Sequence, residues 1–94
     1  MAQCLSNGWC KGGEDNESIF YLKIVGSDNV RFVTTTDKIV YRNGEPNTET
    51  LSQYDCQAMR VRVRASTGGP WSEWRYILPD SIGEVNLRMA CRML

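Results

Sequence analysis

Histidine is absent from this 94-residue chain, which otherwise carries 11 basic and 11 acidic side chains. Because histidine is the commonest general acid–base group at neutral pH and a frequent metal ligand, its absence removes the usual route to either kind of site. The nearest approach to a reactive cluster is Tyr54-Asp55-Cys56, where Cys56 opens an apolar segment and is expected to be an inert, buried thiol. We predict that the chain is not an enzyme and that it binds no cofactor.

Net charge and long apolar runs are also lacking. With equal numbers of acidic and basic side chains, the chain has no general attraction to nucleic acid or to an anionic membrane. No window approaches the roughly 18 apolar residues that span a bilayer, and residues 1–5 lack the basic and apolar order of a secretory signal. We therefore expect a soluble protein that resides in the cytoplasm or, after assembly, in a virion.

The four cysteines, Cys4, Cys10, Cys56 and Cys91, allow two disulfides in an oxidising compartment. Without a recognisable signal peptide, we expect free, buried thiols that pack as small apolar groups instead. Their spacing and the lack of histidine do not suit zinc, so no metal site is predicted from them.

Residues 1–17 are the least regular part of the chain, because Asn7-Gly8 and Gly12-Gly13 are typical of turns. Leu5 and Trp9 favour packing of this segment against the body as a short edge strand. Glu14, Asp15 and Glu17 follow in one acidic run. Calcium ligation by that run lacks the rest of the pattern of a calcium-binding loop, so we interpret it as a solvated loop.

Short segments with the composition of β-strands follow at regular intervals. The nearly continuous apolar run 18–25 predicts a central strand or one that is covered on both faces, and alternation over 30–36 predicts a second strand. Asp37-Lys38 is interpreted as a turn before another strand at 39–41, and Asn43-Gly44 as a tight turn after it. Residues 48–53 fit either an edge strand or a loop.

The clearest pattern lies within 56–79. Residues 59–65 alternate between two sets of side chains, Met59, Val61, Val63 and Ala65 on one side and Arg60, Arg62 and Arg64 on the other. This period of two is typical of a strand with one buried and one wet face. Residues 67–70, Thr-Gly-Gly-Pro, predict a turn, and 71–78 predict the returning strand of a hairpin.

The tail shows a similar alternation, in which Val85, Leu87, Met89, Cys91 and Met93 share one face. It predicts a final strand that pairs within the sheet or with a neighbouring subunit. No segment longer than about ten residues shows helical spacing with recognisable caps. Residues 1–94 are therefore expected to form a single all-β domain, a small antiparallel sandwich or barrel of about six or seven short strands.

Trp71 and Trp74 stand three residues apart, so a regular strand would direct them to opposite faces. A bulge or a polyproline-like twist would instead bring both rings to one side, where they could stack on the three arginines. Such a row of rings and guanidinium groups also serves as a purely structural clamp, because arginine stems cover aromatic surface.

The Arg-Val-Arg-Ala strand end followed by Trp-Ser-Glu-Trp resembles the last two strands of a fibronectin type III domain. In cytokine receptors that region carries a WSxWS box stacked on arginines. The likeness covers residues 59–74, and Arg75 stands where the box has its last serine. The same sequence pattern is similar to modules in bacteriophage tail and fibre proteins. These resemblances imply a β-sandwich module of the fibronectin type III or immunoglobulin kind.

We consequently hypothesise a non-enzymatic structural or interaction module, a small component of a larger assembly such as a bacteriophage virion, with a protein partner or self-association. Its predicted contact residues are Trp71, Trp74, Tyr76, Arg60, Arg62 and Arg64, because aromatic side chains and arginine dominate interface energetics. The alternative is a recognition module that binds a protein or a glycan. Oligonucleotide binding is a third hypothesis, which the neutral net charge disfavours. The identity of the partner and the symmetry stay open.

Overall fold

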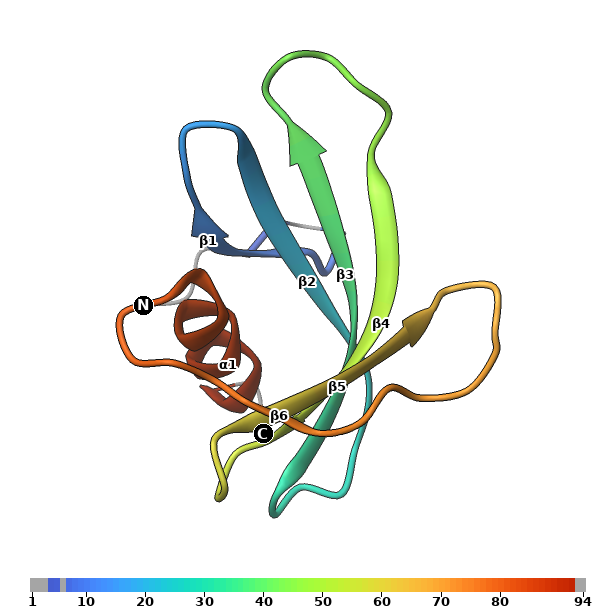
Figure 1. Cartoon of the computed structure of the whole chain (residues 1–94), viewed down its shortest axis with the longest axis vertical. Helices are drawn as coiled ribbons and strands as arrows, with labels where there is room; N and C mark the ends of the chain where they lie inside the picture. The colour runs from blue at the N-terminus through green and yellow to red at the C-terminus, as the bar shows by residue number, and fades with distance from the viewer. Residues whose placement is uncertain (1–3, 6, 93–94) are drawn as a thin grey trace.

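In a computed structural model, the described residues, 4–5 and 7–92, form one antiparallel sheet and one helix (Figure 1). The strands are β1 (Cys10–Glu14), β2 (Ser18–Ser27), β3 (Phe32–Tyr41), β4 (Thr48–Asp55), β5 (Arg60–Ala65) and β6 (Arg75–Tyr76). The sheet order is β1-β2-β3-β4-β5-β6, so every strand lies beside its neighbour in the sequence. This meander needs only hairpin connections. The predicted predominance of antiparallel β-structure is confirmed.

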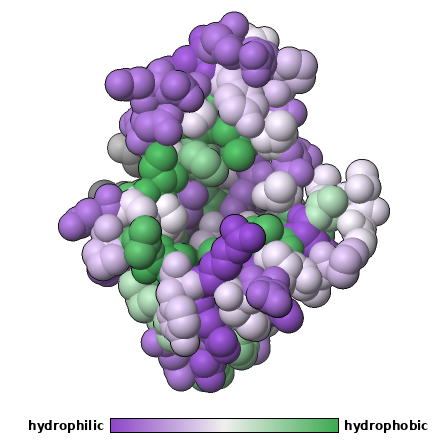
Figure 2. Space-filling model, viewed as in Figure 1, coloured by the Kyte–Doolittle hydropathy of each residue, from purple (hydrophilic) through white to green (hydrophobic). Residues whose placement is uncertain are grey.

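The described strands belong to one sheet, and the second layer is helix α1 (Ile82–Arg92) rather than the second sheet of a sandwich. In Figure 1 the helix lies against one face of the sheet, below the β1–β2 and β3–β4 connections. Figure 2 shows that hydrophilic residues cover the end of the molecule with those two connections, whereas hydrophobic residues gather near its middle. No helix within the described ranges is long and apolar enough to span a membrane.

The predicted C-terminal strand is wrong, because the residues from Ile82 to Arg92 are helical. The helix buries Asn86, Leu87, Met89 and Ala90, and this spacing matches one face of a helix. Met93, the last member of the predicted strand face, lies outside the described residues. Alternation in the tail was compatible with either structure, and packing against the sheet selects the helix.

The start of the helix carries a signal that decides between the two. Ser81 Oγ accepts a hydrogen bond from the Glu84 amide at 3.2 Å, and Glu84 Oε1 accepts one from the Asp80 amide at 3.4 Å. A serine followed three residues later by glutamate is the sequence pattern of a helix N-terminus. The pattern Ser81-Ile82-Gly83-Glu84 therefore indicates a helix despite the alternation that follows it.

The turn predicted at Asp37-Lys38 is also wrong, since β3 continues through both residues to Tyr41. Asp37 pairs with Leu22 on one side and Thr50 on the other. It is only 6% exposed. Hydroxyl groups on β3 and β4 satisfy its carboxylate, so a residue type common in turns is accommodated inside a strand.

The register of the strands separates two faces, which we call inner and outer. The inner face packs against α1 around a buried core of Leu22, Val33, Tyr54, Leu87 and Ala90. On the outer face, rows of paired residues run across the strands, among them Lys38–Glu49, Lys23–Thr36–Leu51–Arg64, Thr34–Gln53–Arg62 and Phe32–Asp55–Arg60–Tyr76.

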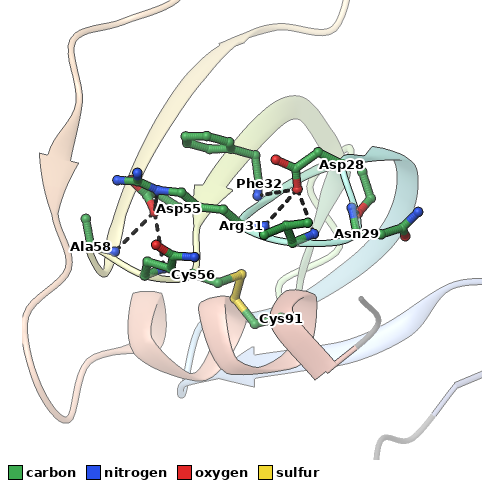
Figure 3. The surroundings of a disulfide bond; sticks show 11 residues. Asp28, Asn29, Arg31, Phe32, Asp55, Cys56, Ala58 and Cys91 are labelled. Atoms are coloured by element: carbon green, nitrogen blue, oxygen red, sulfur yellow. Dashed lines mark hydrogen bonds and ion pairs between the residues drawn. A yellow bond between two sulfur atoms is a disulfide. The ribbon is translucent and has the colours of Figure 1, made fainter.

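The cysteines are paired, contrary to the expectation of free thiols. Cys4–Cys10 closes a short N-terminal loop next to β1, the edge strand that lies within the segment predicted to be irregular. Cys56–Cys91 joins the β4–β5 turn to the last turn of α1 (Figure 3). The helix brings Cys91 to this turn, and a C-terminal strand would have placed it elsewhere, so the pairing depended on the wrongly predicted element.

Candidate interaction surface

The predicted hairpin of residues 56–79 is confirmed, although its second arm is mostly irregular. Arg60 lies opposite Tyr76, and Val61 opposite Arg75, so β5 and β6 are antiparallel neighbours. Farther along, the Ser72 amide donates to the Val63 carbonyl at 2.7 Å, and the Val63 amide donates to Ser72 Oγ at 3.0 Å. The returning segment therefore follows β5 along most of its length, but only two of its residues are in strand β6.

Arginines of β5 and tryptophans of the returning segment alternate in one stack, which we call the ladder. Arg64 Cζ lies 4.9 Å from the centroid of the Trp71 ring, and Arg62 Cζ lies 5.0 Å from the same centroid. Arg62 Cζ is also 4.7 Å from the centroid of Trp74, with Arg60 Cζ at 4.5 Å. Each indole is thus next to two guanidinium groups. Both rings share one side because residues 71–74 are not in regular strand geometry.

The ladder continues into the sheet through aromatic and polar contacts. The Phe32 ring centroid lies 5.9 Å from that of Trp74, and Arg31 Cζ lies 5.0 Å from the Phe32 centroid. Arg62 Nε donates to Gln53 Oε1 at 2.7 Å. Arg64 Nε is shielded from solvent without a hydrogen-bond partner among the described groups, and the guanidinium group stacks on Trp71. These contacts hold the ladder in one arrangement.

Asp55 holds Arg60, the arginine at one end of the ladder, and the sequence analysis did not predict this role. Its side chain is 0% exposed and accepts hydrogen bonds from Arg31 Nε at 2.7 Å, Arg31 Nη2 at 2.8 Å and Arg60 Nε at 2.8 Å. The backbone amides of Gln57 and Ala58 donate to the same carboxylate at 3.2 and 3.1 Å (Figure 3). The hydrogen bonds from Arg31 are the main reason why the pKa of Asp55 is well below its usual range, despite burial.

Tyr76 is the exposed end of the predicted contact set. It is 76% exposed and opposes Arg60, so it lies on the outer face beside the ladder. Leu78, two residues farther on, is 71% exposed. Among the described strands, β6 has β5 as its single neighbour and is therefore an edge of the sheet. All six predicted contact residues consequently lie together. The exposed side chains of Tyr76 and Leu78 extend this group along the edge of the sheet.

A second group of cations and aromatic rings lies on the other side of the outer face, around Trp9. Lys38 Nζ is 4.5 Å from the centroid of Trp9 and 5.7 Å from that of Tyr21, and Lys23 Nζ is 6.0 Å from the Trp9 centroid. The Cys4–Cys10 disulfide closes the loop that carries Trp9. We call these residues the Trp9 cluster. Its only sequence signal was the predicted packing of Trp9 against the body.

The chemistry of the ladder favours binding over catalysis, because guanidinium groups stay protonated in proteins and indoles are not nucleophiles. No group of three or more acidic or cysteine side chains suited to a metal occurs in the described part of the chain. In the acidic run, Glu14 already pairs with Lys11 at 2.7 Å and with Arg42 at 2.6 Å. Asp15 accepts hydrogen bonds from the amides of Glu17 and Ser18, both at 2.8 Å. These carboxylates are engaged within the chain.

The chain matches no family model, no curated protein and no solved structure.

Proposed function

We propose that this protein is a non-enzymatic interaction module that docks onto a protein partner through the ladder and the adjacent edge of β6. The observation that carries this proposal is the continuity between the rigid stack and two strongly exposed side chains, Tyr76 at 76% and Leu78 at 71%. Interfaces are typically anchored by a few aromatic and arginine side chains surrounded by weaker contacts. The ladder and its exposed extension offer that composition in one place.

Preorganisation supports the same conclusion. A free arginine or tryptophan loses rotamer entropy when it is immobilised in an interface, at roughly 0.5–1.5 kcal/mol for each side chain. In the ladder, stacking already holds the side chains of Arg60, Arg62, Trp71 and Trp74 within the free protein. A partner that packs on their edges would therefore bind without this ordering cost.

The stacked rings favour a protein partner over a ligand that must stack on an indole. Trp71 lies between Arg62 and Arg64, and Trp74 lies near both Arg60 and Arg62. A ligand that binds by stacking, such as a nucleic-acid base, normally uses the open face of an aromatic side chain. Such a ligand would have to displace a guanidinium group first. This argues against recognition by stacking on the indoles of the ladder.

The two disulfides indicate the compartment in which this module would work. Disulfides persist in oxidising compartments and are rare in the reducing cytosol. We therefore place the working protein in an oxidising environment instead of the cytoplasm. Assembly into a larger particle, such as a bacteriophage virion, remains the broader context that we propose, and it rests on the sequence likeness of the hairpin.

A recognition module of the fibronectin type III kind is the second candidate. The alternating order of arginine and tryptophan favours it, because that stacking is what the resemblance to the WSxWS box implies. Native mass spectrometry separates the two candidates. A component of an assembly is expected to self-associate or to bind one fixed partner, whereas a recognition module is expected to remain a monomer and to bind when titrated with a surface ligand.

The proposed docking is tested with wild-type protein, the double variant Tyr76→Ala/Leu78→Ala and the control Val85→Ala. Val85 is an exposed apolar residue of α1, at 47%, outside the ladder. Each protein is immobilised and used to capture partners from the source organism, and each is also measured alone by native mass spectrometry. We expect wild type and the control to retain the same partner or self-association, and the double variant to bind at least tenfold more weakly.

Equal binding by all three proteins would overturn the proposal. Circular dichroism of each variant shows whether it is folded, and the two substituted side chains are exposed enough that no loss of structure is expected. Trp74→Ala supplies a further measurement, since this side chain contacts Arg60, Arg62 and Phe32. If Trp74→Ala unfolds the chain while the double variant binds normally, the ladder is a structural clamp.

A further inference from the structure

Positive charge is concentrated on the outer face, although the whole chain is neutral. The register of the strands and the stacking contacts place there seven of the basic side chains, Lys11, Lys23, Lys38, Arg31, Arg60, Arg62 and Arg64. Lys11 is neutralised by Glu14, and the buried Asp55 pairs with both Arg31 and Arg60. Glu49, which lies opposite Lys38, is a third carboxylate on this face. A net positive charge therefore remains on the outer face.

The remaining cations lie on two sides of a strip formed by Thr34 and Thr36 of β3 with Gln53 and Leu51 of β4. Lys23 and Lys38, in the Trp9 cluster, lie on one side, and Arg62 and Arg64, in the ladder, lie on the other. Lys23 and Arg64 share one row across the sheet, separated by Thr36 and Leu51. Three strand spacings put the two backbones about 14 Å apart. This width accommodates one extended polymer chain between the two groups of cations.

The floor of this strip is mostly polar and carries no carboxylate, because Glu49 and Asp55 of β4 lie beyond its two ends. Thr34 and Thr36 of β3 face Gln53 and Leu51 of β4, respectively. Threonine hydroxyls and the glutamine amide can donate and accept hydrogen bonds. Leu51 is the one apolar residue in this group of four, so the strip lacks the apolar pockets that anchor most protein partners.

From this arrangement we propose that the outer face binds an anionic polysaccharide, with its sulfate or carboxylate groups at the two sides and its hydroxyl groups over the strip. This site shares Arg62 and Arg64 with the ladder but includes neither Tyr76 nor Leu78 of the proposed docking edge, so Lys23 and Lys38 test it separately from that docking. Polymeric anions attract such a face because binding releases their condensed counterions. A polysaccharide needs hydrogen bonds and charge rather than open aromatic faces, which matches the covered indoles of the ladder.

Two other polyanions fit the charge less well. Single-stranded nucleic acid gains much of its affinity from bases stacked on aromatic side chains, and both indoles of the ladder already stack on guanidinium groups. An acidic peptide would be expected to place apolar side chains in pockets, and the strip offers only Leu51. The two disulfides favour an oxidising compartment, where anionic polysaccharides are encountered.

The experiment measures binding of heparin, a sulfated polysaccharide, by isothermal titration at several salt concentrations. The test variant is Lys23→Gln/Lys38→Gln, which removes two cations from the strip. The matched control is Arg88→Gln/Arg92→Gln, which removes the same charge from α1 on the other side of the sheet. Because both variants change the net charge equally, a difference in their heparin affinities shows that the position of the lost charges matters.

We expect wild type and the control to bind heparin with similar affinity, and the test variant to bind at least tenfold more weakly. The slope of log affinity against log salt should be shallower by about two for the test variant, since each cation contributes close to one counterion. Equal losses in both variants would overturn the proposal, as would failure of wild type to bind heparin.

Two further probes decide between polymer classes. An oligonucleotide of unmodified thymidine nucleotides and a poly-glutamate peptide are titrated under the same conditions. Tighter binding of either of them than of heparin would overturn the assignment to a polysaccharide. Thr36→Glu provides an independent variant that leaves every cation in place and adds a negative charge in the middle of the strip. It is expected to weaken heparin binding at least as much as the loss of the two lysines.

Discussion

Each face of the sheet buries one aspartate, and the two are held in opposite ways. On the outer face, Asp55 is 0% exposed and pairs with the guanidinium groups of Arg31 and Arg60. On the inner face, Asp37 is 6% exposed and accepts hydrogen bonds only from hydroxyl groups. These donors are Thr35 Oγ1, Ser52 Oγ at 2.7 Å and Tyr54 OH at 2.9 Å. Arginine side chains thus neutralise the aspartate on one face of the sheet, whereas uncharged hydroxyl groups hold the aspartate on the other face.

The pKa values differ accordingly. Arginine hydrogen bonds lower the pKa of Asp55 well below its usual range, whereas burial raises the pKa of Asp37 above its ordinary value against the effect of the three hydroxyls. Burial, together with the nearby Asp37 carboxylate, also raises the pKa of Tyr54. Asp55 therefore stabilises the fold at pH values above the ordinary aspartate pKa, and this contribution is lost as the pH falls. Asp37 contributes in the opposite direction. Because burial disfavours its ionisation in the folded state, its contribution to stability is present at low pH and is lost as the pH rises through the raised pKa.

The largest expected effect comes from Asp55→Ala, which leaves two arginines without their anion and removes the acceptor of two backbone amides. Breaking a buried ion pair by removal of one partner costs about 3–5 kcal/mol in the free energy of unfolding. Asp28→Ala is the control, because Asp28 is exposed and its carboxylate accepts from the amides of Val30, Arg31 and Phe32 without a bidentate arginine. Urea denaturation measures both variants. A loss for Asp55→Ala no greater than for Asp28→Ala would refute the role of cation pairing.

The disulfide that joins the β4–β5 turn to α1 should matter more than the one that closes the N-terminal loop. Cys56 and Cys91 are 35 residues apart, whereas Cys4 and Cys10 are 6 residues apart. Loop-closure entropy predicts a loss of about 4 kcal/mol for the double alanine variant of the first pair and about 2 kcal/mol for the second. Thermal and urea unfolding compare the two variants. Equal losses would show that the link between the β4–β5 turn and the helix constrains the chain no more than the N-terminal disulfide does.

A tight contact on the inner face gives the next effect. In Gly12→Ala the added Cβ would be close to Asn86 Oδ1 and, at 2.5 Å, to Leu22 Cδ1. Such overpacking typically costs about 1–3 kcal/mol in the free energy of unfolding. Gly26→Ala is the matched control, since the nearest atom to its Cβ is Thr34 Cβ at 4.0 Å. If both substitutions leave stability unchanged, the helix is not packed against β1 as closely as the structure indicates.

The contrast between the faces also explains which features the sequence could reveal. The hairpin and the arginine side of β5 were predictable because strict alternation is a local signal, and tight glycine turns fix where the chain reverses. Asp37 was misleading, since its three donors come from β3 and β4 and no local rule shows that they meet it. Asp55 was missed for the same reason, because Arg31 lies 24 residues away in the chain.

Helix α1 was missed for a different reason. Its apolar residues satisfy the alternation of a strand as well as the spacing of a helix, and only the Ser81–Glu84 pattern at its start distinguishes the two. The Trp9 cluster depends on the Cys4–Cys10 disulfide, so free cysteines could not have predicted it. Both disulfides required knowledge of the fold, because connectivity does not follow from cysteine spacing.

The smallest expected effect separates the two aspartates by pH. In Asp37→Asn the group that ionises on the inner face is removed, while Asp55 is unchanged and cancels in the comparison with wild type. Because the folded-state pKa of Asp37 is raised, wild type should be favoured over the variant at low pH, and this advantage should decline as the pH rises through the raised value. Urea denaturation of both proteins from pH 4 to pH 8 measures the difference. A difference that is constant, or that grows with pH, would mean that the hydroxyl groups around Asp37 stabilise its charged form as effectively as the arginines stabilise that of Asp55.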